Sequence, residues 1–298
     1  LRFHQAKKAD LTVAVMNVSQ QEVSRFGIMS VDSTQKITKF AEKPKKSEST
    51  LASMGIYVFN TRFLLEQLDL DAAQPDSAHD FGKNIIPRIV EMGRAFAYPF
   101  VGYWVDVGTI QAYWETSMAL LEEQPALDLY NSDWIIHTRS EERPPVKIMP
   151  PGSIEKSMVS NGCNICGTVI NSVLSPGVIV EKGAVVRNSV IMNETIIRAG
   201  AVVSNCVLDK KIEVGPGAQL GYGKDDTPNK LEPDNLNTGI TIAGKSAVIP
   251  AKAVIGRNCR IDPDTKPSDY DTLEIPSGES LQKKIGRASC RERVYHPV

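Results

Sequence analysis

The sequence predicts two folds in succession: an α/β unit in which strands alternate with helices, and after it a parallel β-helix of hexapeptide repeats. The first observation is the distribution of aromatic residues. Of the 19 (8 Phe, 3 Trp and 8 Tyr), sixteen lie in residues 1–150 and only Tyr222 and Tyr270 lie in residues 151–284. Regions whose cores use such different side chains are expected to fold separately. The second observation is an internal repeat.

The repeat has a period of 17 residues and occurs in three consecutive copies, NSVLSPGVIVEKGAVVR (171–187), NSVIMNETIIRAGAVVS (188–204) and NCVLDKKIEVGPGAQLG (205–221). Aliphatic residues recur at steps of six, six and five, whereas a helix would need steps of three and four. A step of six is typical of one short strand and one turn, so three steps close one coil. The expected inward residues are Leu174, Val180, Val186, Ile191, Ile197, Val203, Leu208, Val214 and Leu220.

Turn residues and flanking copies support the same architecture. Gly183, Gly200 and Gly217 recur at one position, where a turn with positive φ is expected. A less regular copy is expected at 157–170. Another is expected after a polar insertion (222–238), with its aliphatic positions at Ile242, Val248 and Val254. A β-sandwich is the alternative for many short strands, but three copies in register favour the β-helix.

The first half alternates strand and helix patterns. Strands are expected at 11–18, at 26–31 and 37–40 as a hairpin, at 53–59 and at 95–101; helices are expected at 61–68 after Asn60, from Asp80 to about 92, and at 109–123. A proline-rich stretch follows. The expected organisation is therefore an α/β unit at 1–123, a linker at 124–156, a β-helix at 157–262 and a tail at 263–298.

Composition excludes several classes of function. The chain has 34 Lys and Arg against 35 Asp and Glu, a net charge of −1, so no basic surplus points to nucleic acid. Its apolar runs are far shorter than the roughly 20 residues that span a bilayer, and no signal peptide is visible. Five cysteines do not make a disulfide framework in a chain of 298 residues, so a cytoplasmic location is expected.

Both ends of the chain are unusual. It begins at Leu1 without Met, and it ends on a stretch whose residues IGRASCRERV (285–294) match a translated sequencing adapter. Residues 285–298 are therefore interpreted as a non-native sequencing artefact and are left out of the fold prediction.

Two short motifs carry candidate chemistry. Glu42, Lys43 and Pro44 follow a predicted strand, where one cation would face a phosphate and one carboxylate would face hydroxyl groups. In this lysine-rich loop a surface ion pair is the alternative. Asp106 lies between a predicted strand and a helix start, where α/β sheets bind ligands, and a carboxylate there would suit a hard cation. Capping of the next helix is its alternative, and both stay open.

Other candidates carry weaker signals. Ser53 precedes a buried strand and Gly27 begins one, so on residue type alone they are a strand-end hydroxyl and a small packing residue. Cys163 and Cys166 have CxxC spacing, but no second pair or nearby His accompanies them, so packing is expected rather than zinc or redox chemistry. His79 and Asp80 are expected to form a structural polar pair.

Taken together, segments from residue 1 to about residue 261 resemble bacterial ADP-glucose pyrophosphorylases, the glucose-1-phosphate adenylyltransferases. They are ADLTVAV (9–15), RFGIM (25–29), FAEKP (40–44), ASMGIYVFN (52–60), HDFGKNIIP (79–87), AYPF (97–100), YWVDVGT (103–109) and GKSAVIPAKAVIGRN (244–258). EKP and DVGT occur across sugar nucleotidyltransferases, whereas ASMGIYVF and HDFGK at this spacing are similar to the ADP-glucose branch.

The resemblance implies transfer of an adenylyl group from ATP to glucose 1-phosphate, giving ADP-glucose and pyrophosphate for glycogen synthesis. By position in the motifs, Lys43 would contact the sugar phosphate and Glu42 the glucose hydroxyls. Gly27 and Ser53 would line the sugar pocket, and Asp106 would help to hold Mg²⁺. The resemblance also implies a homotetramer with allosteric control. It implies a Rossmann-like nucleotidyltransferase domain followed by a left-handed β-helix.

The chain departs from the family at its beginning. The family's Gly-rich nucleotide loop, its leading Arg and Lys and a second metal-binding Asp all precede the position that matches Leu1. The α/β unit is therefore expected to be the C-terminal half of the catalytic domain. The remaining catalytic residues stay unknown, and the chain is expected to be inactive alone. Val105 also stands where the family usually has a charged residue.

Three alternatives are weighed against this function. Another sugar-phosphate nucleotidyltransferase would share EKP and DVGT. A non-catalytic regulatory subunit would share the fold, but it would not need to keep Lys43, Glu42, Ser53 and Asp106. A β-helix acyltransferase usually needs a catalytic His in its coils, and residues 151–284 contain none.

Overall fold

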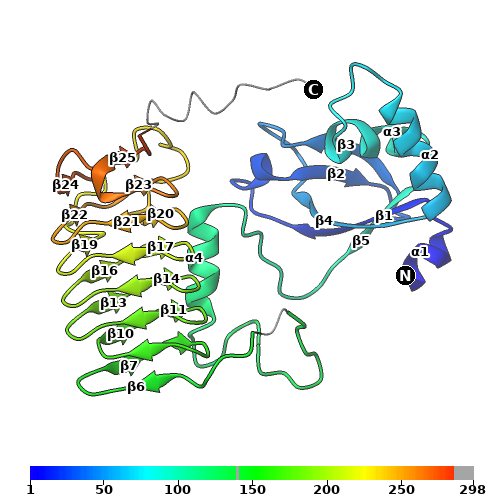
Figure 1. The fold of residues 1–298 in the computed structure, drawn as a ribbon. Coiled ribbons are helices and arrows are strands. Elements are labelled where there is room, and N and C mark those ends of the chain that lie inside the picture. Colours follow the sequence, from blue (N-terminus) through cyan, green and yellow to red (C-terminus); the bar gives the residue numbers. More distant parts are fainter. Residues whose placement is uncertain (139–140, 285–298) are drawn as a thin grey trace, which may run out of the picture. The chain divides into compact units, whose positions relative to one another are not determined.

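The computed structural model describes residues 1–138 and 141–284, so the interpretation of 285–298 as non-native lies outside the described residues. Contacts divide the chain into two compact units, Leu1–Trp104 and Val105–Val298. Figure 1 shows the elements of each unit. No helix in the described part of the chain is long and apolar enough to cross a membrane.

The first unit is built on a mixed five-stranded sheet with the order β3-β2-β4-β1-β5. Its strands are β1 (Leu11–Asn17), β2 (Gly27–Val31), β3 (Ile37–Glu42), β4 (Leu51–Phe59) and β5 (Ala95–Pro99). β2 and β3 form the expected hairpin. β1 pairs antiparallel with β4 and parallel with β5. All five expected strands are thus present, and their sheet is the α/β architecture that the alternating pattern predicts.

Short helices accompany this sheet: α1 (Arg2–Lys7), η1 (Val23–Arg25), α2 (Thr61–Ala72), η2 (Phe81–Ile85, a π-helical turn) and α3 (Ile86–Glu91). Ile85, Ile86 and Ile89 are buried in one core cluster with residues of β1, β3 and β5. Asp80 lies directly before η2, where the start of a helix was expected, and its Oδ1 accepts the backbone N–H of Lys83 at 2.8 Å. Asn60 precedes α2 as expected, but its side chain makes no capping hydrogen bond.

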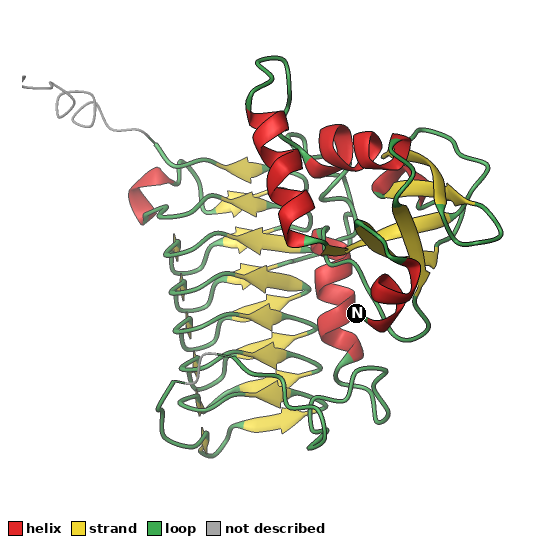
Figure 2. Cartoon of the chain, turned by 90° about the vertical axis from the view of Figure 1, so that its right-hand side faces the viewer, coloured by secondary structure: helices red, strands yellow, loops and turns green. Residues whose placement is uncertain are grey.

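The second unit contains a β-helix of three parallel sheets (Figure 2). The first sheet holds β6 (Lys147–Ile148), β9 (Asn164–Ile165), β12 (Ile179–Val180), β15 (Ile196–Ile197), β18 (Glu213–Val214) and β21 (Val248–Ile249). The second holds β7 (Ser153–Glu155), β10 (Thr168–Ile170), β13 (Val185–Arg187), β16 (Val202–Ser204), β19 (Gln219–Leu220), β22 (Val254–Ile255) and β24 (Glu274–Ile275). The third holds β8 (Met158–Val159), β11 (Val173–Leu174), β14 (Val190–Ile191), β17 (Cys206–Leu208), β20 (Thr241–Ala243), β23 (Arg260–Ile261) and β25 (Ser280–Leu281).

The 17-residue repeat forms the coils in the predicted register. All nine aliphatic residues expected to point inward have at most 1% of their surface exposed and belong to one core cluster. Gly183, Gly200 and Gly217 have φ values of 75°, 68° and 67°, in the left-handed region that glycine adopts without strain. Each is followed by a fully buried alanine. The β-helix prediction is therefore confirmed for these coils.

The register expected after the insertion is wrong by one residue. Ile242, Val248 and Val254 are only half-buried, whereas Ala243, Ile249 and Ile255 are buried in the core cluster. Successive side chains of a strand point to opposite faces, so a shift of one residue exchanges the two sets. In two of these strands both residues are aliphatic, so hydrophobicity alone does not distinguish the inward one.

The β-helix is also longer than expected at both ends. β6 and β7 lie in the expected linker (124–156) and pair with β9 and β10. β24 and β25 lie in the expected tail (263–298) and pair with β22 and β23, with the short helix η3 (Pro267–Asp269) before them. An end coil is covered on one side only, so its aliphatic pattern is weaker. Ile148, for example, is 50% exposed.

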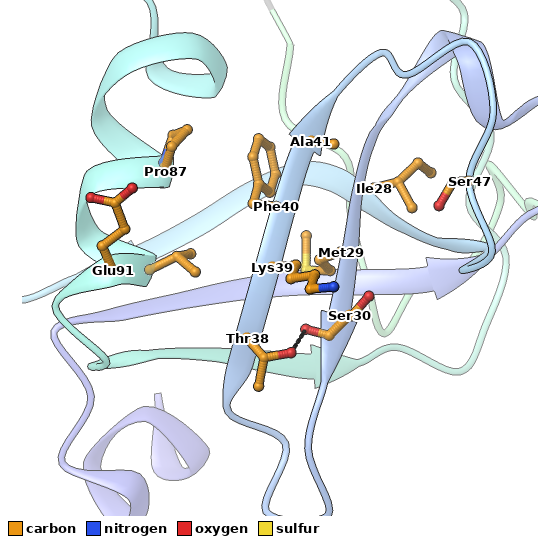
Figure 3. A pocket seen from close by; sticks show the side chains of 11 residues that line it. Ile28, Met29, Ser30, Thr38, Lys39, Phe40, Ala41, Ser47, Pro87 and Glu91 are labelled. Atoms are coloured by element: carbon orange, nitrogen blue, oxygen red, sulfur yellow. Dashed lines mark hydrogen bonds between the residues drawn. The ribbon is translucent and has the colours of Figure 1, made fainter.

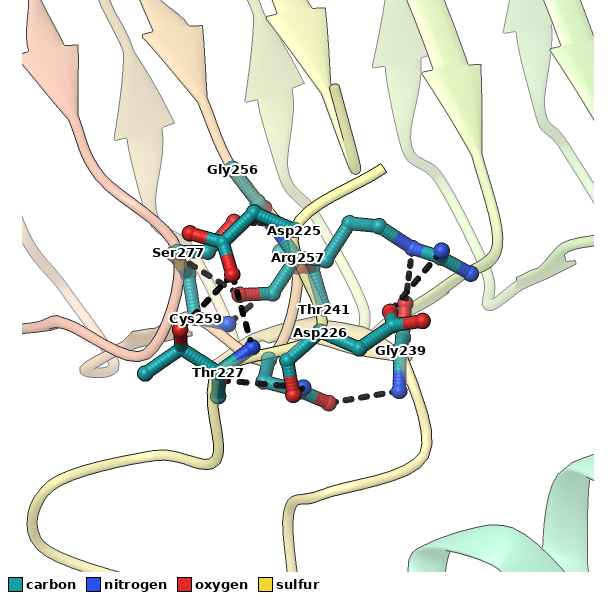
Figure 4. A network of polar contacts seen from close by, with 10 residues as sticks. Asp225, Asp226, Thr227, Gly239, Thr241, Gly256, Arg257, Cys259 and Ser277 are labelled. Carbon is teal, nitrogen blue, oxygen red and sulfur yellow. Dashed lines mark hydrogen bonds and ion pairs between the residues drawn. The ribbon is translucent and has the colours of Figure 1, made fainter. Parts of the chain in front are cut away.

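The insertion between β19 and β20 is held at its base by two residues of the next coil (Figure 4). Arg257 forms an ion pair with Asp226 at 2.8 Å, and its Nε donates to the carbonyl of Gly239 at 3.4 Å. Asn258 Oδ1 accepts the N–H of Gly239, and its Nδ2 donates to the carbonyls of Asp226 and Thr227. Both ends of the insertion are therefore tied to one place on the β-helix.

Helix α4 (Ile110–Ala119) groups with the β-helix rather than with the residues before Trp104. The residue after each of four successive strands of the second sheet has a left-handed backbone: Lys156, Asn171, Asn188 and Asn205, with φ from 39° to 51°. Trp114 Nε1 donates to the carbonyl of Asn188 at 2.8 Å. Met118 Sδ accepts from Asn171 Nδ2 at 3.9 Å. The boundary between the two compact units therefore lies before α4. The expected domain limits of 1–123, 124–156 and 157–262 stay a prediction.

Candidate functional site

Three of the five expected site residues lie on adjacent strands at one place in the first unit. Gly27 begins β2 and is paired with Glu42, the last residue of β3. On the other side of β2, Ile28 is paired with Ala52 in an antiparallel register, which places Gly27 beside Ser53 of β4. The structure therefore brings Gly27, Glu42 and Ser53 together, although they are up to 26 residues apart in the sequence.

The side chain of Glu42 fills the space that two glycines leave open. An ideal Cβ at Gly27 would lie 2.9 Å from Glu42 Oε2, and one at Gly82 would lie 2.5 Å from the same oxygen. Real Cβ atoms do not approach so closely, so a side chain at either position would displace the carboxylate. Gly82, in the HDFGK segment, was not among the expected site residues.

Ser53 is buried, with 7% of its surface exposed, and it makes two polar contacts. Its Oγ accepts the backbone N–H of Gly55 at 3.2 Å and lies 3.4 Å from the hydroxyl oxygen of Tyr57. The ring of Tyr57 is stacked against that of Phe81, with centroids 6.3 Å apart and planes 10° apart. Tyr57 and Phe81 thus join the site, and sequence reasoning missed both.

A sequence signal for Tyr57 did exist. Residues separated by an even number of positions on a strand point to the same face, and Tyr57 follows Ser53 by four. No comparable signal exists for Phe81, because an aromatic residue in an aromatic-rich unit is expected in the core. In the structure Phe81 is 37% exposed instead.

Lys43 follows Glu42 directly and has an unusual backbone. Its φ is 46°, and its N–H donates to the carbonyl of Phe26 at 3.1 Å, which fixes the turn after β3. The side chain is exposed. Within residues 1–138 and 141–284, no carboxylate lies within ion-pair distance of its Nζ. The surface ion pair weighed as the alternative is therefore not formed among the described residues.

Asp106 belongs to the second unit, so the structure does not group it with the other four expected residues. It is half-buried, and its carboxylate oxygens lie 3.0 and 3.2 Å from an ideal Cβ at Gly108. The cap of α4 is Thr109, whose Oγ1 accepts the N–H of Ala112 at 3.1 Å. The helix-cap role that was open for Asp106 is therefore filled by Thr109.

A separate pocket of about 380 Å³ lies beside the hairpin (Figure 3). Residues of β2, β3 and α3 line it, including Met29, Phe40 and Glu91. None of the five expected site residues does. Its lining is partly polar and partly apolar, and Lys39 is the one cation among the described residues that line it. Because it shares none of the five expected residues, this pocket is distinct from the site around Glu42.

The cysteine pair behaves as packing residues. Cys163 is buried, its Sγ donates to the carbonyl of Ser175 at 3.2 Å, and burial raises the pKa of its thiol. Cys166 Sγ lies 3.7 Å from Asn164 Oδ1. Across the part of the chain that the structure describes, no group of three or more His, Cys, Asp or Glu could hold a metal ion.

The expected pairing of His79 with Asp80 is wrong. His79 Nδ1 lies 3.0 Å from Asp71 Oδ2, and Ser77 Oγ donates to Asp71 Oδ1 at 2.8 Å. These hydrogen bonds, from His79 first and then from Ser77, hold the pKa of Asp71 below its usual value. Asp80 instead caps η2, because its backbone precedes that turn and its carboxylate faces the free N–H groups.

Comparisons with known proteins define the class of this fold and site. Residues 1–123 match the family model described as nucleotidyl transferase, and residues 144–242 match the GlmU-like C-terminal hexapeptide model. The chain is thus a nucleotidyltransferase unit joined to a left-handed β-helix of hexapeptide repeats.

Relatives identify the particular family. Glucose-1-phosphate adenylyltransferase of Thermomicrobium roseum is 49% identical over 302 residues, covering 93% of this chain and 65% of the relative. That of Thermotoga maritima is 46% identical over 279 residues (93% and 66%), and that of Pseudothermotoga lettingae 45% over 283 residues (95% and 67%). The chain belongs to the glucose-1-phosphate adenylyltransferase family. It spans about two thirds of the length of these curated relatives.

Proposed function

We propose that the chain provides the sugar-phosphate site of an enzyme that transfers an adenylyl group from ATP to glucose 1-phosphate. The observation that carries this proposal is the cluster of Gly27, Glu42 and Ser53 in a chain of this family. In the reaction a phosphate oxygen of glucose 1-phosphate attacks the α-phosphate of ATP. Pyrophosphate leaves, and the new bond makes ADP-glucose.

Glu42, Lys43 and two neighbouring aromatic rings each recognise a different part of the sugar phosphate. The carboxylate of Glu42, held in the space beside Gly27 and Gly82, accepts hydrogen bonds from glucose hydroxyls. Lys43 Nζ, exposed and without a carboxylate partner among the described residues, contacts the phosphate. The rings of Tyr57 and Phe81 offer an apolar surface to the sugar. Catalysis then rests on positioning and charge neutralisation, with no covalent intermediate.

Asp106 is the residue of this chain that would contribute to holding Mg²⁺. Mg²⁺ takes oxygen ligands and commonly binds through one or two carboxylates, with waters and substrate phosphates completing its shell. A single half-buried carboxylate, not needed to cap α4, fits that donor set. When bound, Mg²⁺ would neutralise negative charge on the phosphates.

We also propose the assembly and setting that the family suggests. The full-length protein would be a homotetramer in the cytoplasm, making ADP-glucose for glycogen synthesis. Its mass by light scattering tests the assembly, and a monomer at micromolar concentration would contradict it.

The sugar-phosphate role is tested with Lys43→Ala in an extended protein, meaning this chain preceded by the N-terminal segment of its Thermotoga maritima relative. A charge-assisted contact to phosphate is worth about 1.5–3 kcal/mol, so the KM for glucose 1-phosphate should rise about ten- to a hundredfold. The KM for ATP should change little. Lys46→Ala, in the same loop, is the control and should alter neither. Equal rises in both KM values would make Lys43 structural.

Product analysis of the unmodified extended protein separates the remaining alternatives. ADP-glucose formed from ATP and glucose 1-phosphate supports the proposal. A different sugar nucleotide would indicate another nucleotidyltransferase. The absence of any product from a folded, extended protein would indicate a regulatory subunit.

A further inference from the structure

The position of Asp106 depends on the helix that follows it. Residues 105–108 belong to no strand or helix, and α4 begins at Ile110 after its cap at Thr109. The backbone from Asp106 to the helix is therefore a four-residue loop. Whatever fixes the first turn of α4 also limits where the carboxylate of Asp106 can lie.

α4 is fixed along the β-helix at successive coils. Trp114 Nε1 donates to the carbonyl of Asn188, and Met118 contacts Asn171 one coil earlier. Beyond the helix, Glu122 forms an ion pair with Lys156 at 3.0 Å, one coil earlier again. The Trp114 contact is the one nearest to Asp106. It is also a part-buried hydrogen bond, whereas the Glu122–Lys156 pair is exposed and worth little.

The first turn of α4 meets the insertion as well. A cavity of about 350 Å³ is lined by Gly108, Thr109 and Ile110 on one side and by the insertion and coil residues on the other. Among these, Leu236 is 1% exposed, and Arg260 forms ion pairs with Glu232 at 3.3 Å and Asp262 at 3.0 Å.

The insertion does not move freely against this turn. Asn229 is fully buried, and its Nδ2 donates to the carbonyls of Asn258 and Glu279 at 2.9 and 3.2 Å. Its Oδ1 accepts the N–H groups of Leu231 and Glu232. Because Arg257 and Asn258 hold both ends of the insertion, its residues keep a fixed position beside the first turn of α4.

From these contacts we propose that the β-helix positions Asp106, and that Trp114 is the positioning residue through its hydrogen bond to the Asn188 carbonyl. The inference rests on the proposed function, in which Asp106 contributes to holding Mg²⁺. Its consequence is that a change in the stacking of the coils near Asn188 reaches the metal-binding carboxylate through α4.

The first test measures amide hydrogen exchange in the chain itself. Trp114→Phe keeps the ring but removes the N–H donor, so exchange in α4 should accelerate about threefold to tenfold. Trp134→Phe is the matched control, because it makes the same change at a residue that is 78% exposed and lies outside α4. It should leave exchange in α4 unchanged, as should Lys156→Gln. Unchanged exchange in Trp114→Phe overturns the proposal.

The second test follows Mg²⁺ dependence in the extended protein. Trp114→Phe should lower kcat by a similar factor and raise the Mg²⁺ concentration for half-maximal rate, with the KM for glucose 1-phosphate unchanged. Faster exchange with an unchanged Mg²⁺ dependence would reduce Trp114 to a structural role and overturn the proposal. A different result would show that the proposed function itself is wrong. In that case Asp106→Asn would leave the Mg²⁺ dependence unchanged.

Discussion

The carboxylate of Glu42 occupies the space in which a side chain at Gly27 would lie, 2.9 Å from the ideal Cβ position. The ring of Phe40 closes the same space from another side, at 2.6 Å. Gly27 therefore matters for the room that it leaves, and its backbone needs no unusual φ. The arrangement fixes Glu42 before any ligand arrives, which lowers the ordering cost of recognising hydroxyl groups.

The core of the β-helix is tested with two adjacent valines. Val186→Asp places an unpartnered charge among fully buried aliphatic side chains and should lower the free energy of unfolding by several kcal/mol. Val185→Asp, on the outward side of the same strand, should cost about 1 kcal/mol or less. Urea unfolding of the chain, followed by circular dichroism, measures both. Similar costs for the two variants would refute the register.

Two turn glycines should respond differently to alanine. Gly200 has a φ of 68° and nothing within 4 Å of its ideal Cβ, so Gly200→Ala should cost only the left-handed strain of about 1–2 kcal/mol. Gly221→Ala adds an overlap with the carbonyl oxygen of Ser204 and should cost clearly more. Their melting temperatures provide the comparison. Equal melting temperatures would mean that the coil relaxes around the added methyl group.

The buried Asp71 should make stability fall in acid. Because His79 and Ser77 lower its folded pKa, its contribution is complete above the ordinary pKa of about 3.9 and is lost as pH falls through the lowered value. Asp71→Asn should therefore destabilise the chain at pH 6 and flatten the loss of stability below about pH 4. Unfolding at pH 3 to 6 measures this. The exposed Asp69→Asn is the control, and an identical pH profile for both variants would contradict the assignment.

Removing the charge of Asp106 should affect the reaction and not the fold. In the extended protein, Asp106→Asn should lower kcat about a hundredfold or more, because the amide keeps the shape but loses the charge that attracts the metal. The circular dichroism of the helices should not change, since Thr109 caps α4. An intact kcat together with a lower melting temperature would show that the metal assignment is wrong.

The fold was predictable where a pattern repeats and less so where it stops. The central coils follow from aliphatic steps of six, because one inward side chain per strand is a strong constraint. After the insertion, Val248 and Ile249 are equally aliphatic, so the sequence does not state which of them faces the core. The end coils escaped prediction because their side chains are covered on one side only.

The candidate site was predictable mainly through motifs. Lys43 and Asp106 lie in short motifs with defined neighbours, but their residue types alone are also compatible with an ion pair and a helix cap. The contact of Glu42 with Gly82 forms because the fold brings β3 against η2. The spacing of residues within either segment does not predict it. The Asp71–His79 hydrogen bond was also missed, because it too depends on the fold. From the sequence alone, the adjacent Asp80 was the simpler partner for His79.

The contacts that α4 makes along the β-helix are spaced differently from the coils themselves. Contacts of α4 recur every four residues, a rise of about 6 Å, whereas successive coils are only about 4.8 Å apart. Because the two spacings differ, helix contacts and coils match over a few residues and then fall out of register. Trp114 and Met118 match two coils, but the third match is made by Glu122, after the helix has ended at Ala119. A straight helix can therefore follow only a short run of coils, and the mismatch limits how long α4 can usefully be.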